Sequence, residues 1–178
     1  MLLLVGGGGN FSEEGFCDRV MFLGKDIEGR SLTVQIKLVN TIIDLVNIYA
    51  PNEVKDRERF LKGLLGHLTS DNRIVVGDFN VMLSRIDLAQ GMVYKADTSR
   101  KSLVHLMDEF HYVDFWRCRH GAKRDFSRRQ MVEGVLKQSR IDFGLCHVDF
   151  IANIGRVFIS TIHLVIMLHF TFKFTLRN

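Results

Sequence analysis

Residues 41–52 read Thr-Ile-Ile-Asp-Leu-Val-Asn-Ile-Tyr-Ala-Pro-Asn, a run rich in isoleucine and valine that ends at the single proline of the chain, Pro51. β-Branched residues favour strands, and proline cannot donate to a strand ladder, so a strand over 41–49 should end here. In the preceding residues 31–38 every second position is apolar, which is the period of a half-buried strand. Residues 39 and 40 can supply the turn, and the sequence therefore predicts a β-hairpin.

The periodicity changes from two to helical spacing after Asn52. Apolar positions from Val54 to Leu68 predict an amphipathic helix with Asn52 as N-cap and the charged residues 55–59 on its solvated side. Further elements follow: strands at 17–23, 73–76, 135–145, 157–159 and 164–172, a helix over about 99–110 capped by Thr98 or Ser99, and a basic loop over 118–130. Interleaved strands and helices predict a single α/β (α+β) domain over 1–178 with a mixed sheet and an irregular glycine-rich start over 1–16.

Composition excludes several classes of protein. With 178 residues, 47% hydrophobic and 25% charged, the chain is neither disordered nor fibrous. Its three cysteines show no CxxC pairing, so we expect a reducing compartment, nucleus or cytoplasm, and no structural zinc. No basic segment precedes the opening apolar run, and polar residues interrupt the apolar stretch 157–176, so neither a signal peptide nor a membrane span is expected. The formal charge, 24 − 20 = +4, permits a polyanionic partner without requiring one.

Polar residues follow three of the predicted strands at the points where they run into loops. Asp78 and Asn80, after residues 73–76, would share one side of an extended backbone. The aspartate could orient or deprotonate a water and the amide could donate to a phosphate oxygen, although an Asx turn explains the same pair. Gly77 would let the backbone turn and let a ligand approach closely. Tyr49 could reach a phosphate or serve only as a strand-forming aromatic.

Two further sets of residues leave a functional and a structural interpretation open. Asp142 could set the tautomer of His163, which lies in an apolar run, or could pair with Arg140 on the surface while His163 is a core histidine. Basic residues between 123 and 140, which include Arg128 and Arg129, follow Trp116. They suit phosphate contacts with an aromatic wedge, or form a solvated loop.

The order of these motifs resembles the endonuclease/exonuclease/phosphatase superfamily, which has the deoxyribonuclease-I-like fold. Within it, the sequence resembles the apurinic/apyrimidinic-type endonuclease domain of LINE-type (non-LTR) retrotransposons. The resemblance covers about residues 29–163. It is carried by Leu45-Val46-Asn47-Ile48-Tyr49-Ala50-Pro51-Asn52, Gly77-Asp78-Phe79-Asn80, Val113-Asp114-Phe115-Trp116-Arg117, Phe126-Ser127-Arg128-Arg129 and the stretch from Ser139 to Leu145.

The resemblance implies a four-layer sandwich of two packed mixed sheets with outer helices, and Mg²⁺-dependent hydrolysis of a phosphodiester, with DNA as the expected partner and RNA as the alternative. It implies that Asp78 activates the water and that Asp142 supports a charged His163. Asn80 would hold the phosphate, Tyr49 would contact the phosphate or the leaving group, and Asn52 would line the site. From the residues themselves, we expect Arg140, Arg128, Arg129 and Trp116 to bind substrate.

Two departures from the family pattern bear on catalysis. The late family motif Ser-Asp-His is replaced by Thr161-Ile162-His163, which has no carboxylate at its middle position. The start of the chain, residues 1–9, enters the pattern after the family's metal-binding glutamate, so we expect an N-terminally incomplete fold and name no metal ligand. These departures imply a weak or inactive domain. The alternatives are an active Mg²⁺-dependent endonuclease, a non-catalytic nucleic-acid-binding remnant, and a branch acting on phospholipids, which the Asp-x-Trp-Arg and Ser-Arg-Ile-Asp segments disfavour.

Overall fold

The computed structural model describes residues 19–38, 41–65, 72–154, 157–159 and 166–168. Its strands are β1 Arg19–Lys25, β2 Ser31–Leu38, β3 Thr41–Tyr49, β4 Arg73–Asp78, β5 Tyr112–Asp114, β6 Arg128–Val132, β7 Val135–Ser139, β8 Asp142–His147, β9 Val157–Ile159 and β10 Ile166–Leu168. Its helices are α1 Val54–Leu65, α2 Thr98–Glu109 and α3 Phe115–His120, with 3₁₀ turns at Arg85–Asp87 and Val148–Asn153. None of the described helices has the length and apolarity needed to cross a membrane.

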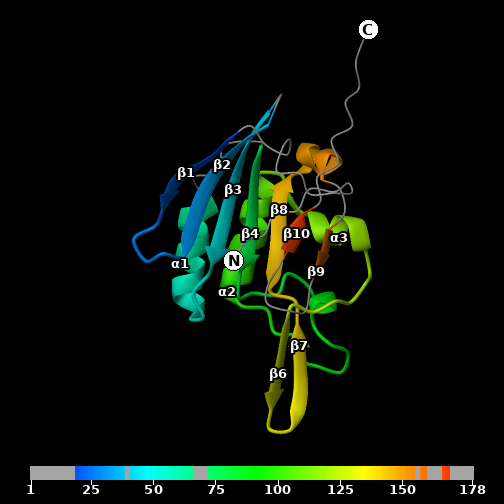
Figure 1. The fold of residues 1–178 in the computed structure, drawn as a ribbon. Coiled ribbons are helices and arrows are strands. Elements are labelled where there is room, and N and C mark those ends of the chain that lie inside the picture. The colour runs from blue at the N-terminus through cyan, green and yellow to red at the C-terminus, as the bar shows by residue number, and fades with distance from the viewer. Residues whose placement is uncertain (1–18, 39–40, 66–71, 155–156, 160–165, 169–178) are drawn as a thin grey trace.

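A six-stranded mixed sheet in the order β1-β2-β3-β4-β8-β5 forms the body of the molecule (Figure 1). Strands β3 and β4 are parallel, and every other neighbouring pair in this sheet is antiparallel. The predicted hairpin is confirmed, with Leu38 opposite Thr41. The α/β class is confirmed as well. Within the described residues the remaining strands form two antiparallel pairs, β9–β10 and the hairpin β6–β7.

Helices cover both faces of the main sheet. Val46 and Val75 point to the face on which α1 and α2 lie, where they pack in one core with Leu61 and Leu103. Residues of the opposite face pack in a second core with Phe115 and Trp116 of α3, and β9 contacts the same helix. The hairpin β6–β7 projects from the lower end of the sheet (Figure 1). This end is where the candidate site lies.

Two glycines permit close approaches that the sheet requires. Gly77 has φ +133°, and a Cβ there would lie 2.0 Å from the carbonyl oxygen of Ile48 on β3. A Cβ on Gly144 would lie 1.8 Å from the ring of Phe115, so this glycine makes room for α3. The close approach of a ligand at Gly77 stays a prediction, and the structure gives a different reason for this glycine. It lies within β4 and brings the backbones of two strands together.

Several local predictions are corrected by the structure. The α1 side chain Arg57 is only 4% exposed rather than solvated, and the first helical bond runs from its N–H to Glu53 O, so Asn52 is not the N-cap. Asp97, not Thr98 or Ser99, caps α2. The supposed basic loop contains the end of α3 and the start of β6. The long strand expected over 135–145 is two strands, because the buried Arg140 interrupts it.

Candidate active site

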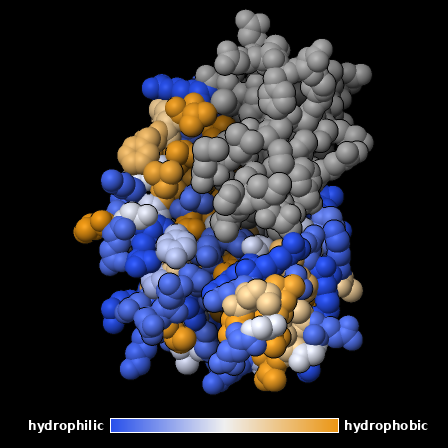
Figure 2. Space-filling view, turned by 60° about the horizontal axis from the view of Figure 1, so that its bottom comes forward, coloured by the Kyte–Doolittle hydropathy of each residue, from blue (hydrophilic) through white to orange (hydrophobic). Residues whose placement is uncertain are grey.

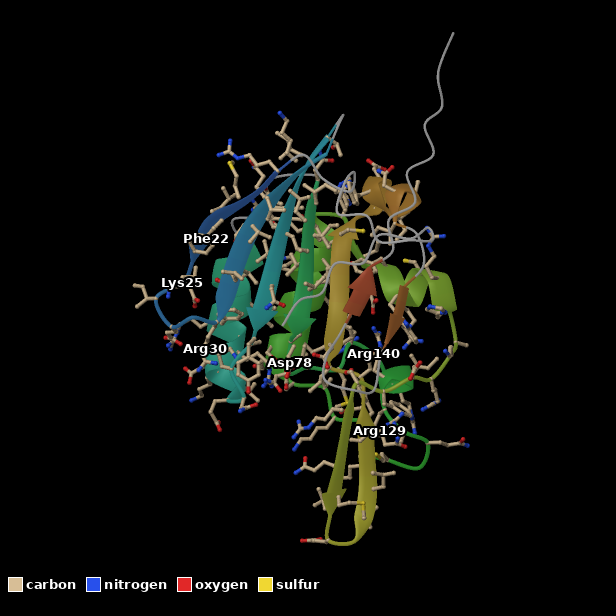
Figure 3. All side chains as sticks on the ribbon, viewed as in Figure 1. Phe22, Lys25, Arg30, Asp78, Arg129 and Arg140 are labelled. Atoms are coloured by element: carbon tan, nitrogen blue, oxygen red, sulfur yellow. The ribbon has the colours of Figure 1, made fainter. Side chains whose placement is uncertain are left out.

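Three strands of the main sheet place polar side chains at one end. Tyr49 pairs with Asp78 across the parallel strands β3 and β4, and Asp78 pairs with Asp142 across the antiparallel strands β4 and β8. Directly paired residues in neighbouring strands point to the same face of a sheet. The structure therefore brings together three residues from distant parts of the sequence, and Figure 3 shows Asp78 at this end, close to the base of the hairpin that carries Arg129.

A pocket of about 440 Å³ opens at this end of the sheet. It is lined by Tyr49, Asn52, Asp78, Asn80, Ser127, Arg128, Arg129, Ile141 and Asp142. Seven of these residues were predicted from the sequence as site residues. Two were not, Ser127 and Ile141. The motif order signals Ser127, which directly precedes the two arginines, but nothing in the sequence signals that Ile141 would border the pocket.

Asp78 and Asn80 meet in the pocket for a reason other than the one expected. Asn80 is not extended: its φ is +50°, and its backbone N–H donates to Asp78 Oδ1 at 2.7 Å, which is an Asx turn. Asparagine tolerates this left-handed conformation better than most residues. The Asn80 amide also donates to Ala50 O at 2.7 Å. Among the described residues, one amide hydrogen and the amide oxygen of Asn80 have no further partner and remain for a ligand.

Burial changes the acidity of both carboxyl groups. It raises the pKa of Asp78, and the N–H of Asn80 together with the positive charges of Arg128 and Arg57 partly offsets that increase. Burial raises the pKa of Asp142 further, to about 6; the Ser127 hydroxyl and the charge of Arg140 oppose this increase, and the charge of Asp78 adds to it. The pocket therefore contains an aspartate whose charged form is poorly stabilised by the surrounding chain.

Asp142 is also unusual in its hydrogen bonding. Its backbone N–H and that of Ile141 both donate to Ser127 Oγ at 3.2 Å, which attaches the start of β6 to the start of β8. Both carboxylate oxygens, however, are buried without a hydrogen-bond partner among the described residues. A buried carboxylate left in this way is costly, so it points to a partner or a ligand at this position.

The predictions that Arg140 and Trp116 bind substrate were wrong. Arg140 is 1% exposed, and its guanidinium donates to Asp87 Oδ1 at 2.9 Å and to Asp114 Oδ2 at 2.6 Å. Trp116 is 3% exposed and stacks within 4.9 Å of the Arg140 guanidinium. These side chains form a buried charge cluster behind the pocket, because Asp87 has no exposure to water and requires a cation.

The predicted catalytic residue His163 lies outside the described residues. Among the residues that the structure describes, no group of three or more histidine, cysteine or acidic side chains could hold a metal. Asp78 and Asp142 are two carboxylates, one of them already bonded to Asn80 and the other buried. The described part of the chain therefore does not by itself fit a complete Mg²⁺ site.

The mixed sheet, the helices on both faces and the pocket at the strand ends define the class of fold as deoxyribonuclease-I-like, and solved structures confirm it. The endonuclease domain of TRAS1, a telomere-specific non-LTR retrotransposon, matches with a TM-score of 0.57 and 17% identity over 73% of this chain and 56% of that one. The AP endonuclease LMAP from Leishmania major matches with a TM-score of 0.58 and 17% identity, over 75% of this chain and 50% of that one.

A relative in sequence is more specific. The chain is 30% identical over 133 residues to the transposon TX1 uncharacterized 149 kDa protein of Xenopus laevis, an alignment that covers 72% of this chain. The aligned region spans only 10% of the length of that Xenopus laevis protein. No family model matches the sequence. The resemblance to retrotransposon endonucleases stated from the motifs is confirmed, while the roles of the individual residues stay predictions.

Proposed function

We propose that residues 1–178 form one endonuclease-like domain of retrotransposon origin, which binds the phosphodiester backbone of DNA and hydrolyses it weakly or not at all. The observation that carries this proposal is the convergence of Tyr49, Asp78 and Asp142 at adjacent strand ends, in a pocket bordered by two arginines. Phosphodiester hydrolysis needs an acidic side chain that activates a water molecule, and hydrogen-bond donors and cations that bind the phosphate.

The geometry suggests how the residues would divide the work. The arginines Arg128 and Arg129 would attract the backbone phosphates, since both are exposed at the rim. The free amide hydrogen of Asn80 would donate to a non-bridging oxygen, and the hydroxyl of Tyr49, whose side chain is 52% exposed, would reach the phosphate or the leaving oxygen. Asp78, with its raised pKa, would orient and deprotonate the attacking water.

Asp142 would need a cationic partner to remain ionised in its buried place. The family resemblance offers His163 for that part, as a proton-bearing imidazole that would stabilise charge developing on phosphorus. Sequence position 162 is isoleucine where related domains have aspartate, so one acidic group of the reaction is absent. Losing one such group typically costs about a hundredfold to a thousandfold in rate, which is the basis for proposing impaired catalysis.

Nucleases of this fold generally use divalent metals, and a bound Mg²⁺ would need ligands beyond the described residues of this chain. A plasmid-nicking assay with Mg²⁺ and with EDTA tests the proposal, using the unaltered chain, Asp78→Asn, and Asp56→Asn on the exposed side of α1 as the control. We expect DNA binding by all three proteins, with slow or undetectable nicking. Fast Mg²⁺-dependent nicking that only Asp78→Asn abolishes would show an active endonuclease instead. Absence of DNA binding would contradict the proposal altogether.

A further inference from the structure

Arg57 is the most unusual residue of helix α1. Its neighbours Lys55 and Asp56 are exposed and Glu58 is half-buried, whereas Arg57 is 4% exposed and reaches the start of α2. Burial of a charged arginine is costly unless its N–H groups find acceptors. The identity of those acceptors shows what the residue holds in place.

The guanidinium of Arg57 binds two different segments at once. Nη1 donates to the main-chain oxygens of Pro51 and Asn52 at 3.1 and 2.5 Å. On the other side, Nη2 donates to Asp97 Oδ2 at 2.7 Å and Nε to Ser99 Oγ at 2.8 Å, both at the start of α2. A lysine cannot reproduce this planar fork with its single ammonium group.

The segment 50–52 that Arg57 holds is also bonded to the pocket. The N–H of Ala50 donates to Asp78 O at 2.7 Å, and the oxygen of Ala50 accepts from the Asn80 amide at 2.7 Å. Asn52 itself lines the pocket. The backbone of 50–52 is thus fixed by Arg57 on one side and by Asp78 and Asn80 on the other, while Arg57 does not line the pocket.

We propose that Arg57 is a positioning residue of the phosphodiester pocket, which sets the path of residues 50–52 and through them the places of Asn52 and Asn80. The expected effect of Arg57 on the rate of DNA hydrolysis rests on the proposed function, whereas its effect on the backbone of residues 50–52 does not. Misplacing a reacting group by about 1 Å can cost about a hundredfold in rate, so a residue that never touches substrate can still control catalysis.

The test uses Arg57→Met and Arg57→Lys, with Arg73→Met as the matched control. Arg73 is also a largely buried arginine, paired with Asp44 at 2.9 Å, but it lies at the start of β4, five residues and roughly 16 Å along the strand from Asp78. Hydrogen–deuterium exchange reports on the segment around Ala50 in each protein, together with the unfolding temperature and the affinity for a DNA duplex.

We expect both Arg57 variants to exchange the Ala50 amide at least tenfold faster than Arg73→Met at matched stability, with DNA affinity changed less than threefold. If the unaltered chain nicks DNA, kcat should fall about tenfold or more in Arg57→Met, with little change in KM. The fall in kcat should be smaller in Arg57→Lys. Exchange at Ala50 equal to that in Arg73→Met would overturn the inference. If the unaltered chain does not nick DNA, the exchange result still decides it. If Arg57→Met does not fold, Arg57→Lys carries the same comparison.

Discussion

Asp78 and Asp142 lie directly opposite each other in the antiparallel pair β4–β8, so two carboxyl groups face one pocket from neighbouring strands. Within the described part of the chain, neither carboxyl group forms an ion pair with an arginine, since Arg140, two residues from Asp142, pairs with Asp87 and Asp114. The sheet thus holds two acidic side chains at its end that nearby arginines stabilise only at a distance, and this arrangement has measurable consequences.

The first consequence is a pH-dependent cost in stability at Asp142. The folded chain holds the Asp142 proton more tightly, because its pKa rises from 3.8 to about 6, so stability falls as the pH rises between these values and stays lower above them. With the described residues alone around the carboxylate, Asp142→Asn should increase the free energy of unfolding by about 1–3 kcal/mol at pH 7.5 and by much less at pH 4, whereas pairing with a charged His163 would make the same change destabilising. Urea denaturation at both pH values measures this. A destabilised Asp142→Asn at pH 7.5 would mean that the carboxylate has a cationic partner.

A second prediction compares two glycines. A methyl group at Gly77 would collide with Ile48 O in a backbone conformation unfavourable to other residues, so Gly77→Ala should cost roughly 3–5 kcal/mol or prevent folding. Gly63 lies in α1 with nothing near its missing Cβ, and Gly63→Ala should stabilise by about 0.5–1 kcal/mol through helix propensity. Thermal denaturation of both variants checks the pair. Equal effects would show that the β3–β4 approach is not the cause.

A third prediction separates two arginines that the sequence presents alike. Arg140→Met removes the cation that the buried Asp87 and Asp114 share and leaves Arg117 paired with Asp87, so it should destabilise the fold by about 3–5 kcal/mol, chiefly through Asp114. Arg129→Met, on the exposed hairpin, should change stability by less than about 0.5 kcal/mol. Chemical denaturation distinguishes them. A stable Arg140→Met protein with weakened DNA binding would restore the substrate-binding role rejected above.

The fourth prediction concerns the salt dependence of DNA binding. The exposed Arg128 and Arg129 border the pocket. Figure 2 shows that hydrophilic side chains surround an apolar cluster at the end of the molecule where the hairpin lies. If each arginine contacts one phosphate, replacing both by glutamine should reduce the slope of log K against log salt by about 1.8. Fluorescence anisotropy at several salt concentrations measures the slope. An unchanged slope would place the contacts elsewhere.

Local patterns predicted the parts of the fold that depend on neighbouring residues. Alternation over residues 31–38 and the β-branched run before Pro51 were enough for the β2–β3 hairpin, and the motif order was enough to associate Asp78 with Asp142. A strand end is a local property, so the pocket residues that close strands were predictable.

The buried charges were not predictable for the opposite reason. Arg140 bonds to Asp87, 53 residues away, and Arg57 to Ser99, 42 residues away. When the hydrogen-bond acceptors of a buried arginine lie so far along the chain, its sequence neighbourhood is the same as that of an arginine exposed to solvent. Sequence spacing alone could not distinguish Arg140, which supports the site from behind, from Arg129, which lines it.

The order of the strands also has a consequence for how the protein is made. Strand β8 lies between β4 and β5 although 63 residues separate its start from the end of β4. Closing such long loops is slow, because the chain entropy is lost before the contacts form. A nascent chain on the ribosome has Tyr49 and Asp78 paired only after β4 emerges, and gains Asp142 only once β8 inserts. The pocket therefore forms late in synthesis. Chains released before β8 emerges contain Tyr49 and Asp78 but lack Asp142, and so they lack the complete pocket.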